Sequence, residues 1–246
     1  MHIPRLYIPQ TLAENTSIEL EPAAAHHITK VLRMKPGRKL IIFNGQVYRD
    51  AVGEFSAVIA SIEKKRVMVE LTAFVPRQTE SLLAIELGVC IIKPDRMDWL
   101  LQKACELGVN TVAPLWSEYT DVKLPAERLE KKLHHWRQVL ISASEQSGRT
   151  RVPALIEPQP LAQWTSTVKA DQCRVLHPYV QSSSQTVASP SSLALLVGPE
   201  GGLSDAEVEL ALDQGFAPMT LGPRILRAET APLAAISLLQ SQYGDW

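Results

Sequence analysis

The chain has 246 residues, of which 46% are hydrophobic and 21% are charged, and its formal net charge is −1. This size suits one large domain or two modest ones, and the composition excludes intrinsic disorder and fibrous repeats. No apolar run approaches the roughly 18–20 residues of a membrane span. Three widely spaced cysteines indicate neither a disulfide framework nor a zinc site, so we expect a reduced protein of the cytoplasm without a bound metal.

The net charge is an average over two unlike parts. Residues 1–80 hold 11 Lys and Arg against 8 Asp and Glu, whereas residues 81–246 hold 14 against 18. A net charge near zero by itself argues against a nucleic-acid partner. However, the basic residues of the first part are concentrated in a window, 30–39, that contains no acid. This window predicts either a phosphate-binding surface or only a solvated face.

The first part is predicted to be rich in β-strands. Short strands are expected at 5–8, 17–20, 39–43, 46–48, 55–62 and 66–74, and a helix at 22–32. Asn44-Gly45 is the strongest hairpin signal in the chain, because Asn and Gly accept the positive φ of a type I′ turn. Short strands joined by tight turns indicate a small barrel or sandwich.

The pattern changes near Pro76, which separates two predicted domains, 1–75 and 76–246. From Leu82 onward, apolar runs alternate with helical periodicity, which predicts an α/β domain with a parallel sheet. Asp95 is expected to cap a helix that Gly108 ends, and Pro125 to open a longer helix. Further strands are predicted at 83–92, 110–115, 173–176 and 193–197, and a loop at 181–192.

The segment Leu195-Leu196-Val197-Gly198-Pro199-Glu200-Gly201-Gly202-Leu203 carries a glycine-rich loop directly after a predicted strand. Ser204 and Glu207 then form a capping box that opens a helix. Glycines let the backbone approach a ligand closely, and α/β proteins bind ligands at the carboxyl ends of strands. The loop is neither a Rossmann fingerprint nor a P-loop, so by itself it fits a ligand loop and a structural turn equally well.

A second segment repeats this arrangement over Leu221-Gly222-Pro223-Arg224-Ile225-Leu226-Arg227-Ala228-Glu229-Thr230. A short strand again ends at Gly-Pro, and Thr230 is a plausible N-cap for a terminal helix. A salt bridge could account for two of the three charged residues Arg224, Arg227 and Glu229. The repetition nevertheless favours two loops that line one pocket.

Together these two segments resemble the RsmE family, 16S ribosomal RNA uridine-N3 methyltransferases of the SPOUT superfamily. Supporting pieces are Val31-Leu32-Arg33-Met34, Gln102-Lys103-Ala104-Cys105-Glu106-Leu107-Gly108, Ser144-Glu145-Gln146-Ser147-Gly148-Arg149 and Leu176-His177-Pro178. The chain departs from the family pattern at Tyr119, where Arg is usual, at Ala228, where Thr is frequent, and at Arg96, which stands for a common Lys.

The resemblance implies a trefoil-knotted SPOUT methyltransferase domain preceded by a small PUA-like β-barrel. It implies a homodimer that binds S-adenosylmethionine (SAM) among the knot loops and forms 3-methyluridine at nucleotide 1498 of 16S rRNA, within the 30S subunit. Carried onto this sequence, the residues expected at the cofactor are Leu176, His177, Pro178, Val197, Gly198, Pro199, Glu200, Gly201, Gly202, Leu221, Gly222, Leu226, Arg227, Ala228 and Thr230.

Methylation of uridine N3 requires removal of a weakly acidic proton and stabilisation of the resulting anion. Arg227 is the first candidate to stabilise that anion, because its guanidinium is a fixed, planar set of donors. Glu200 could accept the proton or only a hydrogen bond, His177 is a weaker candidate base, and Glu229 could orient Arg227. The residues expected to bind RNA are Arg5, Lys30, Arg33, Lys35, Arg38, Lys39, Arg149 and Arg151.

Three other functions remain open from the sequence. A related SPOUT enzyme that methylates a ribose 2′-hydroxyl of rRNA or tRNA would share the knot loops but carry a different accessory domain. A non-catalytic RNA-binding assembly factor would be expected to have lost the glycines that this chain retains. A dinucleotide-dependent enzyme is disfavoured by the missing fingerprint.

Overall fold

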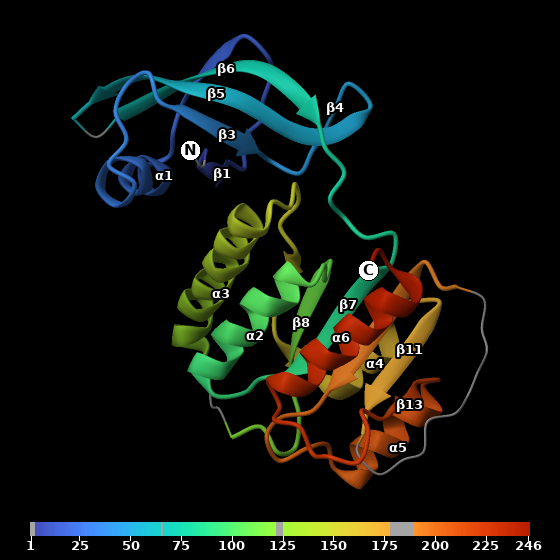
Figure 1. Ribbon diagram of the computed structural model, residues 1–246. Helices are drawn as coiled ribbons and strands as arrows, with labels where there is room; N and C mark the ends of the chain where they lie inside the picture. Colours follow the sequence, from blue (N-terminus) through green and yellow to red (C-terminus); the bar gives the residue numbers. More distant parts are fainter. Residues whose placement is uncertain (1–2, 65, 122–124, 178–188) are drawn as a thin grey trace. The chain divides into compact units, whose positions relative to one another are not determined.

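The computed structural model describes residues 3–64, 66–121, 125–177 and 189–246 (Figure 1). The chain divides into two compact units. The first comprises Met1–Glu80 and Ser144–Val152, and the second comprises Ser81–Ala143 and Pro153–Trp246. The segment Ser144–Val152 therefore belongs to the first unit although it lies far along the chain, a feature that no local sequence pattern indicates.

In the part of the first unit that the structure describes, six strands form one sheet of order β1-β3-β5-β6-β2, with β4 paired to β5. The elements are β1 (Arg5–Tyr7), β2 (Thr16–Glu19), α1 (Pro22–His26), a π-helical turn (His27–Val31), β3 (Lys39–Phe43), β4 (Val47–Tyr48), β5 (Ala51–Glu63) and β6 (Arg66–Pro76). Alternate apolar residues of the strands, such as Leu40 and Ile42, are buried in one core with Ile28 from the π-helical turn. The strand-rich prediction is confirmed.

The hairpin predicted at Asn44-Gly45 is wrong. β3 pairs with β1 and β5, whereas β4 pairs with β5 through a turn at Arg49 and Asp50, whose φ angles are 47° and 65°. The side chain of Asn44 accepts a hydrogen bond from the N–H of Gln46 (3.0 Å) and donates one to the carbonyl of Gln10 (2.9 Å). Asn44 thus satisfies a local Asx turn, and the pairing of the long strand β5 decides where the hairpin forms.

Buried ion pairs hold the segment Ser144–Val152 within the first unit. Arg149 pairs with Glu80, and Arg5 pairs with Glu54 while donating a hydrogen bond to the carbonyl of Arg149 (2.8 Å). The carboxylate of Glu145 accepts a hydrogen bond from the N–H of Tyr7 (2.9 Å). Burial raises the pKa of Glu145, and the hydrogen bond from Tyr7 opposes this shift only in part.

The described part of the second unit contains a seven-stranded sheet of order β10-β8-β7-β12-β11-β13, with β9 paired to β8, and all of its pairings are parallel. The elements are β7 (Ala84–Cys90), α2 (Pro94–Glu106), β8 (Thr111–Trp116), α3 (Ala126–Ser147), β9 (Ala154–Leu155), β10 (Gln159–Pro160), α4 (Leu161–Thr167), β11 (Gln172–Leu176), β12 (Ser192–Val197), α5 (Asp205–Asp213), β13 (Ala217–Met219) and α6 (Thr230–Tyr243). The last residues of α3 are those counted with the first unit. The predicted α/β architecture with a parallel sheet is confirmed.

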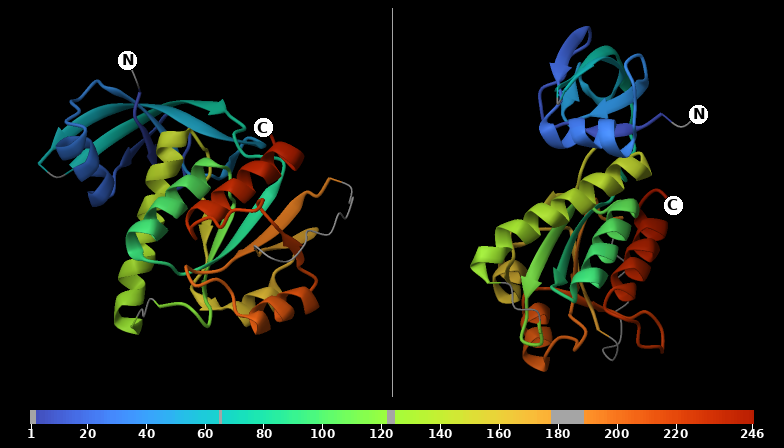
Figure 2. Two further views of the ribbon diagram at one scale, coloured as in Figure 1. Left: turned by 60° about the horizontal axis from the view of Figure 1, so that its bottom comes forward. Right: turned by 90° about the vertical axis from the view of Figure 1, so that its left-hand side faces the viewer.

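Helices cover both faces of this sheet. Helices α2 and α6 pack side by side on one face, and α4 and α5 contact each other on the other (Figures 1 and 2). In β12, Ala194 and Leu196 pack in a cluster with Trp164 of α4, whereas the alternate residues Leu193 and Leu195 are also buried. Because side chains alternate across a strand, a sheet covered on both faces requires this continuous apolar run. None of the described helices is long and apolar enough to cross a membrane.

Helix ends follow the sequence signals in part. Ser204 and Glu207 form the predicted capping box of α5, and Gly215 follows its end with φ +87°. In α2, however, the N-cap is Lys93 and Pro94 occupies the first turn, so Asp95 does not cap the helix as predicted. Proline favours the first helical position because its missing N–H needs no partner there.

Replacing Gly88 by alanine is expected to destabilise the second unit by about 1–3 kcal/mol. Gly88 lies in the central strand β7, where an added Cβ would come within 2.7 Å of Cζ2 in the ring of Trp164, which is 1% exposed. The indole is held by a hydrogen bond from its Nε1 to Glu86 (2.7 Å), so it cannot easily move away. Urea unfolding of the variant measures the loss. An unfolding midpoint unchanged from that of the wild type would contradict the packing argument.

Candidate functional site: a pocket at the carboxyl ends of β11, β12 and β13

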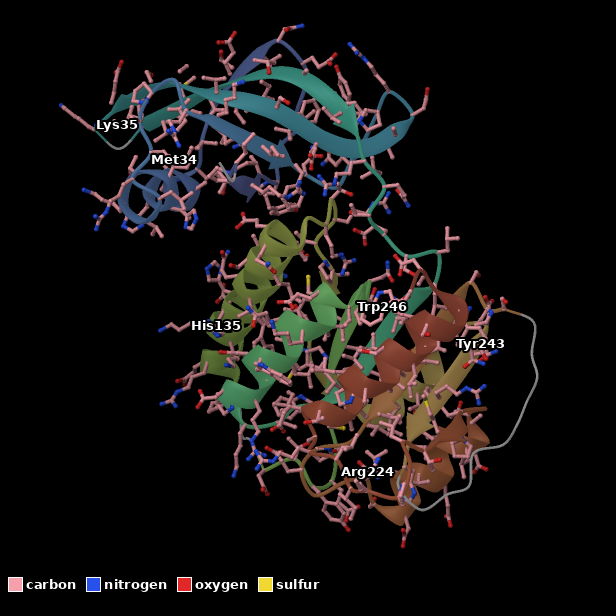
Figure 3. All side chains as sticks on the ribbon, in the orientation of Figure 1. Met34, Lys35, His135, Arg224, Tyr243 and Trp246 are labelled. Atoms are coloured by element: carbon pink, nitrogen blue, oxygen red, sulfur yellow. The ribbon has the colours of Figure 1, made fainter. Side chains whose placement is uncertain are left out.

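Three neighbouring parallel strands, β12, β11 and β13, end at the same edge of the sheet, and the segments that follow them enclose a pocket of about 510 Å³. Figure 3 labels Arg224 at this end of the second unit, on the segment between β13 and α6. The pocket is where the topology of an open parallel sheet predicts a ligand site, and its volume is in the range of sites for small organic ligands.

The structure brings together most of the residues that the sequence predicts at a cofactor. Those that line the pocket are Leu176, His177, Val197, Gly198, Pro199, Glu200, Gly201, Gly202, Leu221, Gly222, Leu226, Arg227 and Ala228. Thr230 and Glu229 are not among the lining residues, and Pro178 lies outside the described residues. Their contact with a ligand stays a prediction.

The loop after β12 is compact and leaves its backbone accessible. Gly202 donates a backbone hydrogen bond to the carbonyl of Pro199 (2.9 Å) and adopts φ +78°, a conformation that favours glycine. At Gly198 an added Cβ would lie 3.0 Å from the backbone carbon of Gly202. The glycines therefore allow the tight fold of the loop itself as well as access to its peptide groups.

The carboxylate of Glu200 is engaged in contacts with the start of α2. Its Oε1 accepts a hydrogen bond from the N–H of Lys93, the N-cap (3.2 Å), and lies 3.6 Å from Nη1 of Arg96. A carboxylate at a helix N-terminus satisfies an orphan N–H and interacts favourably with the helix dipole. These contacts favour the hydrogen-bonding alternative for Glu200 over the role of proton acceptor.

Arg227 and Glu229 lie on the second loop in very different environments. The Arg227 side chain is 76% exposed, with its Nη1 3.9 Å from Oε1 of Glu229. Glu229 is buried, and among the described residues its Oε2 has no hydrogen-bond donor. The backbone carbonyl of Arg227 accepts hydrogen bonds from Thr230 and Ala231, each 2.9 Å. The backbone of Arg227 thus supports the start of α6 while its guanidinium is available to a ligand.

Six residues that line the pocket were not among those predicted at the cofactor, although Leu203, Arg224 and Ile225 lie within the two glycine-containing segments. The six are Arg96, Leu203, Met219, Arg224, Ile225 and Ala231. No local signal marked Arg96, because Asp95 in the same turn already offsets a cation at the start of the helix. The others follow from their neighbours in sequence. Beside the pocket, Tyr119 packs against Gly201. A Cβ added at Gly201 would lie 3.1 Å from the Cβ of Tyr119.

Cys90 and Cys173 lie on strands of this sheet, and burial raises the pKa of both thiols. Cys90 ends β7, and burial raises the pKa of its thiol to about 12. It therefore stays protonated at neutral pH. The reactive functions that this part of the chain presents to the pocket are the guanidinium groups of Arg96, Arg224 and Arg227, the carboxylate of Glu200 and the imidazole of His177.

The residues predicted to bind RNA fall into two groups. Lys30, Arg33, Lys35, Arg38, Lys39 and Arg151 are exposed in the first unit. The first five lie on or beside the π-helical turn and the segment before β3, where Figure 3 labels Met34 and Lys35. Val31 and Leu32, 60% and 37% exposed, accompany them. Their contact with RNA stays a prediction.

Arg5 and Arg149, in contrast, are buried. Their side chains are 7% and 5% exposed, and each forms an ion pair with a carboxylate, Glu54 and Glu80 respectively. A phosphate could reach them only by displacing these carboxylates, which would leave buried charges unpaired. Their burial therefore argues against direct contact of these two arginines with RNA and favours a role in the attachment of Ser144–Val152.

Two family models match separate parts of the chain. Residues 79–240 match the model of an RNA methyltransferase domain, and residues 20–72 match that of an RNA methyltransferase PUA domain. The small β domain is thus PUA-like, as predicted.

Relatives of known name cover the whole chain. The ribosomal RNA small subunit methyltransferase E of Buchnera aphidicola (subsp. Schizaphis graminum) is 37% identical over 99% of this chain and 98% of its own length. The enzyme of the same name from Bacillus subtilis is 30% identical over 95% of this chain and 93% of its own.

Solved structures show the same fold. A SAM-bound protein from Legionella pneumophila has 38% identity and a TM-score of 0.93, with both chains covered completely. The SAM-bound ribosomal RNA small subunit methyltransferase E of Neisseria gonorrhoeae has 35% identity and a TM-score of 0.91, with 99% of each chain covered. With its two domains, its glycine loops and relatives of this identity along its length, the chain belongs to the ribosomal RNA small subunit methyltransferase E family.

Proposed function

We propose that this protein transfers the methyl group of SAM to N3 of one uridine in the 16S rRNA of the small ribosomal subunit, and that it does so in the cytoplasm as a homodimer. The observation that carries the proposal is the pocket at the carboxyl ends of β11, β12 and β13, lined by both glycine-containing loops. Membership of the small-subunit methyltransferase family and the SAM-bound relatives support the choice of cofactor and RNA.

The polar and apolar groups that line the pocket fit SAM. The backbone of Val197–Gly202 is open to a polar ligand, and Leu221, Leu226 and Ala228 supply apolar surface. Small-molecule sites commonly combine apolar walls with a few convergent polar groups in this way. When bound, SAM supplies a methyl group attached to a cationic sulfur. We propose that these two loops hold it, with the trefoil knot implied by the family as their scaffold.

The residues of this chain then act on the uridine. The N3 proton must leave, and the resulting charge spreads over N3, O2 and O4, so the protein must place the base and stabilise an anion. Arg227 is suited to the second task, because its exposed guanidinium has a fixed charge and several N–H donors. With Glu200 held at α2, His177 remains as the other candidate to accept the proton.

The first unit is proposed to hold the RNA. Five of the exposed basic residues lie within residues 30–39, a window with no carboxylate, so a phosphate backbone meets only favourable charge there. The remainder of the chain is acidic overall, which limits non-specific attraction and favours release of the product.

A methyl-transfer assay with defined RNA tests the proposed function. The purified protein is incubated with labelled SAM and either 30S subunits, naked 16S rRNA, 50S subunits or tRNA, and the RNA is digested to nucleosides for mass spectrometry. We expect 3-methyluridine, formed from the small-subunit RNA and at one position. A 2′-O-methyl nucleoside, or preferential labelling of tRNA, would contradict the proposal in favour of another SPOUT activity. Failure to bind SAM in calorimetry would favour a non-catalytic RNA-binding factor.

The homodimer has support in the surface of the second unit. Helices α2 and α6, which lie side by side, leave large apolar side chains exposed: Trp99 is 44% and Leu238 is 55% exposed. Exposed apolar side chains on adjacent helices indicate an interface with another surface. A second copy of the chain is the partner that the family leads us to propose.

Replacing Leu238 by glutamate is expected to convert the dimer to a monomer, because a charge would have to be buried without a partner. Light scattering coupled to size exclusion measures the mass directly. The control is Leu212→Glu on α5, which covers the other face of the sheet and is 37% exposed at this position. If the Leu238 variant keeps the dimer mass at low micromolar concentration, α6 does not form the interface.

A further inference from the structure

Arg96 lies between the two loops that form the pocket. It belongs to the first turn of α2, and its side chain is 36% exposed. Its Nη1 is 3.6 Å from Oε1 of Glu200, on the loop after β12, and its Nε is 3.8 Å from Oε1 of Glu229, on the loop before α6. A single guanidinium therefore contacts one carboxylate from each loop.

The position of this arginine is unfavourable without nearby carboxylates, which Asp95 in the same turn and the two loop residues supply. The first turn of an α-helix carries unsatisfied N–H groups and a partial positive charge, so a cation there is repelled. Glu200 offsets the repulsion, since the same Oε1 accepts the N–H of Lys93 at the helix start. Arg96 and Glu200 together thus attach the glycine loop to α2.

The contact with the second loop compensates a buried charge. Glu229 is buried, and its Oε2 has no donor among the residues that the structure describes. The other cation nearby, Arg227, is 76% exposed, so solvent screens its charge more strongly than that of Arg96. Arg96 is therefore the better-placed cation to stabilise the Glu229 carboxylate, which in turn lies next to Arg227.

We propose that Arg96 is a positioning residue: it links the two pocket loops through Glu200 and Glu229 and thereby orients Arg227 towards the substrate. The proposal rests on the proposed methyltransferase function and deepens it. Its physical basis is preorganisation, because loops already fixed at the correct spacing lose less conformational entropy when ligands bind.

Variants of Arg96 test the proposal in the full-length protein. Arg96→Ala is expected to weaken SAM binding about 10-fold in calorimetry, and to lower the single-turnover rate at saturating SAM and RNA about 100-fold, the usual cost of a small misplacement at a reacting centre. Arg96→Lys keeps the charge but cannot reach two carboxylates with a planar fork, so its rate is expected to lie between alanine and wild type. Thermal melting checks that each variant folds.

Two further comparisons separate positioning from other roles. Arg137 is an exposed arginine on α3, and Arg137→Ala is expected to match the wild type. In double-mutant cycles, Arg96→Ala is combined with Glu200→Gln and with Glu229→Gln. The single-turnover rate of each double variant is expected to be only slightly lower than that of Arg96→Ala alone.

The outcomes are distinguishable. Wild-type affinity and rate in Arg96→Ala would overturn the proposal. Additive effects in both cycles would also overturn it, because Arg96 would then act independently of the two carboxylates. A rate of Arg96→Lys as low as that of Arg96→Ala would overturn it too, because a cation at this position would then not be what links the loops. If the wild-type protein itself binds no SAM, the proposed function fails and the positioning role fails with it.

Discussion

Replacing Arg227 by alanine is expected to lower the single-turnover rate of methyl transfer by about 10²–10³-fold, the cost of removing one donor from an anion-stabilising site. The affinity for SAM is expected to stay close to that of the wild type. The reason is that the side chain is 76% exposed at the pocket, whereas the part of Arg227 that supports α6 is its backbone carbonyl. The variant therefore keeps the loop and loses the guanidinium.

Rapid-quench assays with excess enzyme measure the chemical step, and calorimetry measures SAM binding separately. Arg227→Lys retains the charge without the planar set of donors and is expected to recover only part of the rate. Arg137→Ala again controls for the loss of an exposed arginine. An unchanged rate in Arg227→Ala would dismiss this residue as the stabiliser of the uridine anion and direct attention to Arg224, which also lines the pocket.

The second large effect is expected in the first unit, where Arg33 and Lys35 are exposed in the basic window. Replacing both by glutamate should weaken RNA binding at least about 10-fold at moderate salt, because two phosphate contacts become repulsive. Each lost contact should also reduce the slope of log affinity against log salt by roughly 0.7–0.9. Filter binding or fluorescence anisotropy across a salt series measures both quantities.

The control for this variant must change the net charge equally at other positions. Lys131 and Lys169 are exposed in the second unit, and their double replacement by glutamate provides that change. Arg33 has φ +50°, a strained conformation that glutamate shares, so circular dichroism must show that the double variant is folded. If both double variants lose the same affinity and slope, residues 30–39 are only a solvated face.

Many individual strands and helix ends could be predicted from the pattern of apolar and capping residues along the chain. A nearly continuous apolar run over residues 83–92 identified the strand that ends at Cys90, and the pair Ser204 and Glu207 identified the start of α5. These signals are reliable because burial on both faces and helix capping depend on residues close in sequence. The prediction of a hairpin at Asn44-Gly45 was wrong for a related reason. Both β3 and β4 pair with β5, a strand that a pattern of a few neighbouring residues does not reveal.

The functional residues also fall into those that the sequence indicates and those that only tertiary contacts reveal. The two glycine-containing loops and the basic window could be identified from the sequence, because each is a contiguous segment with a recognisable chemistry. Tertiary structure alone decided which charges are available. It buries Arg5 and Arg149 against Glu54 and Glu80, leaves Arg227 exposed, and brings Arg96 between two carboxylates more than a hundred residues along the chain. Burial and ion pairing depend on contacts between distant segments, so no count of charges along the sequence could have distinguished these arginines.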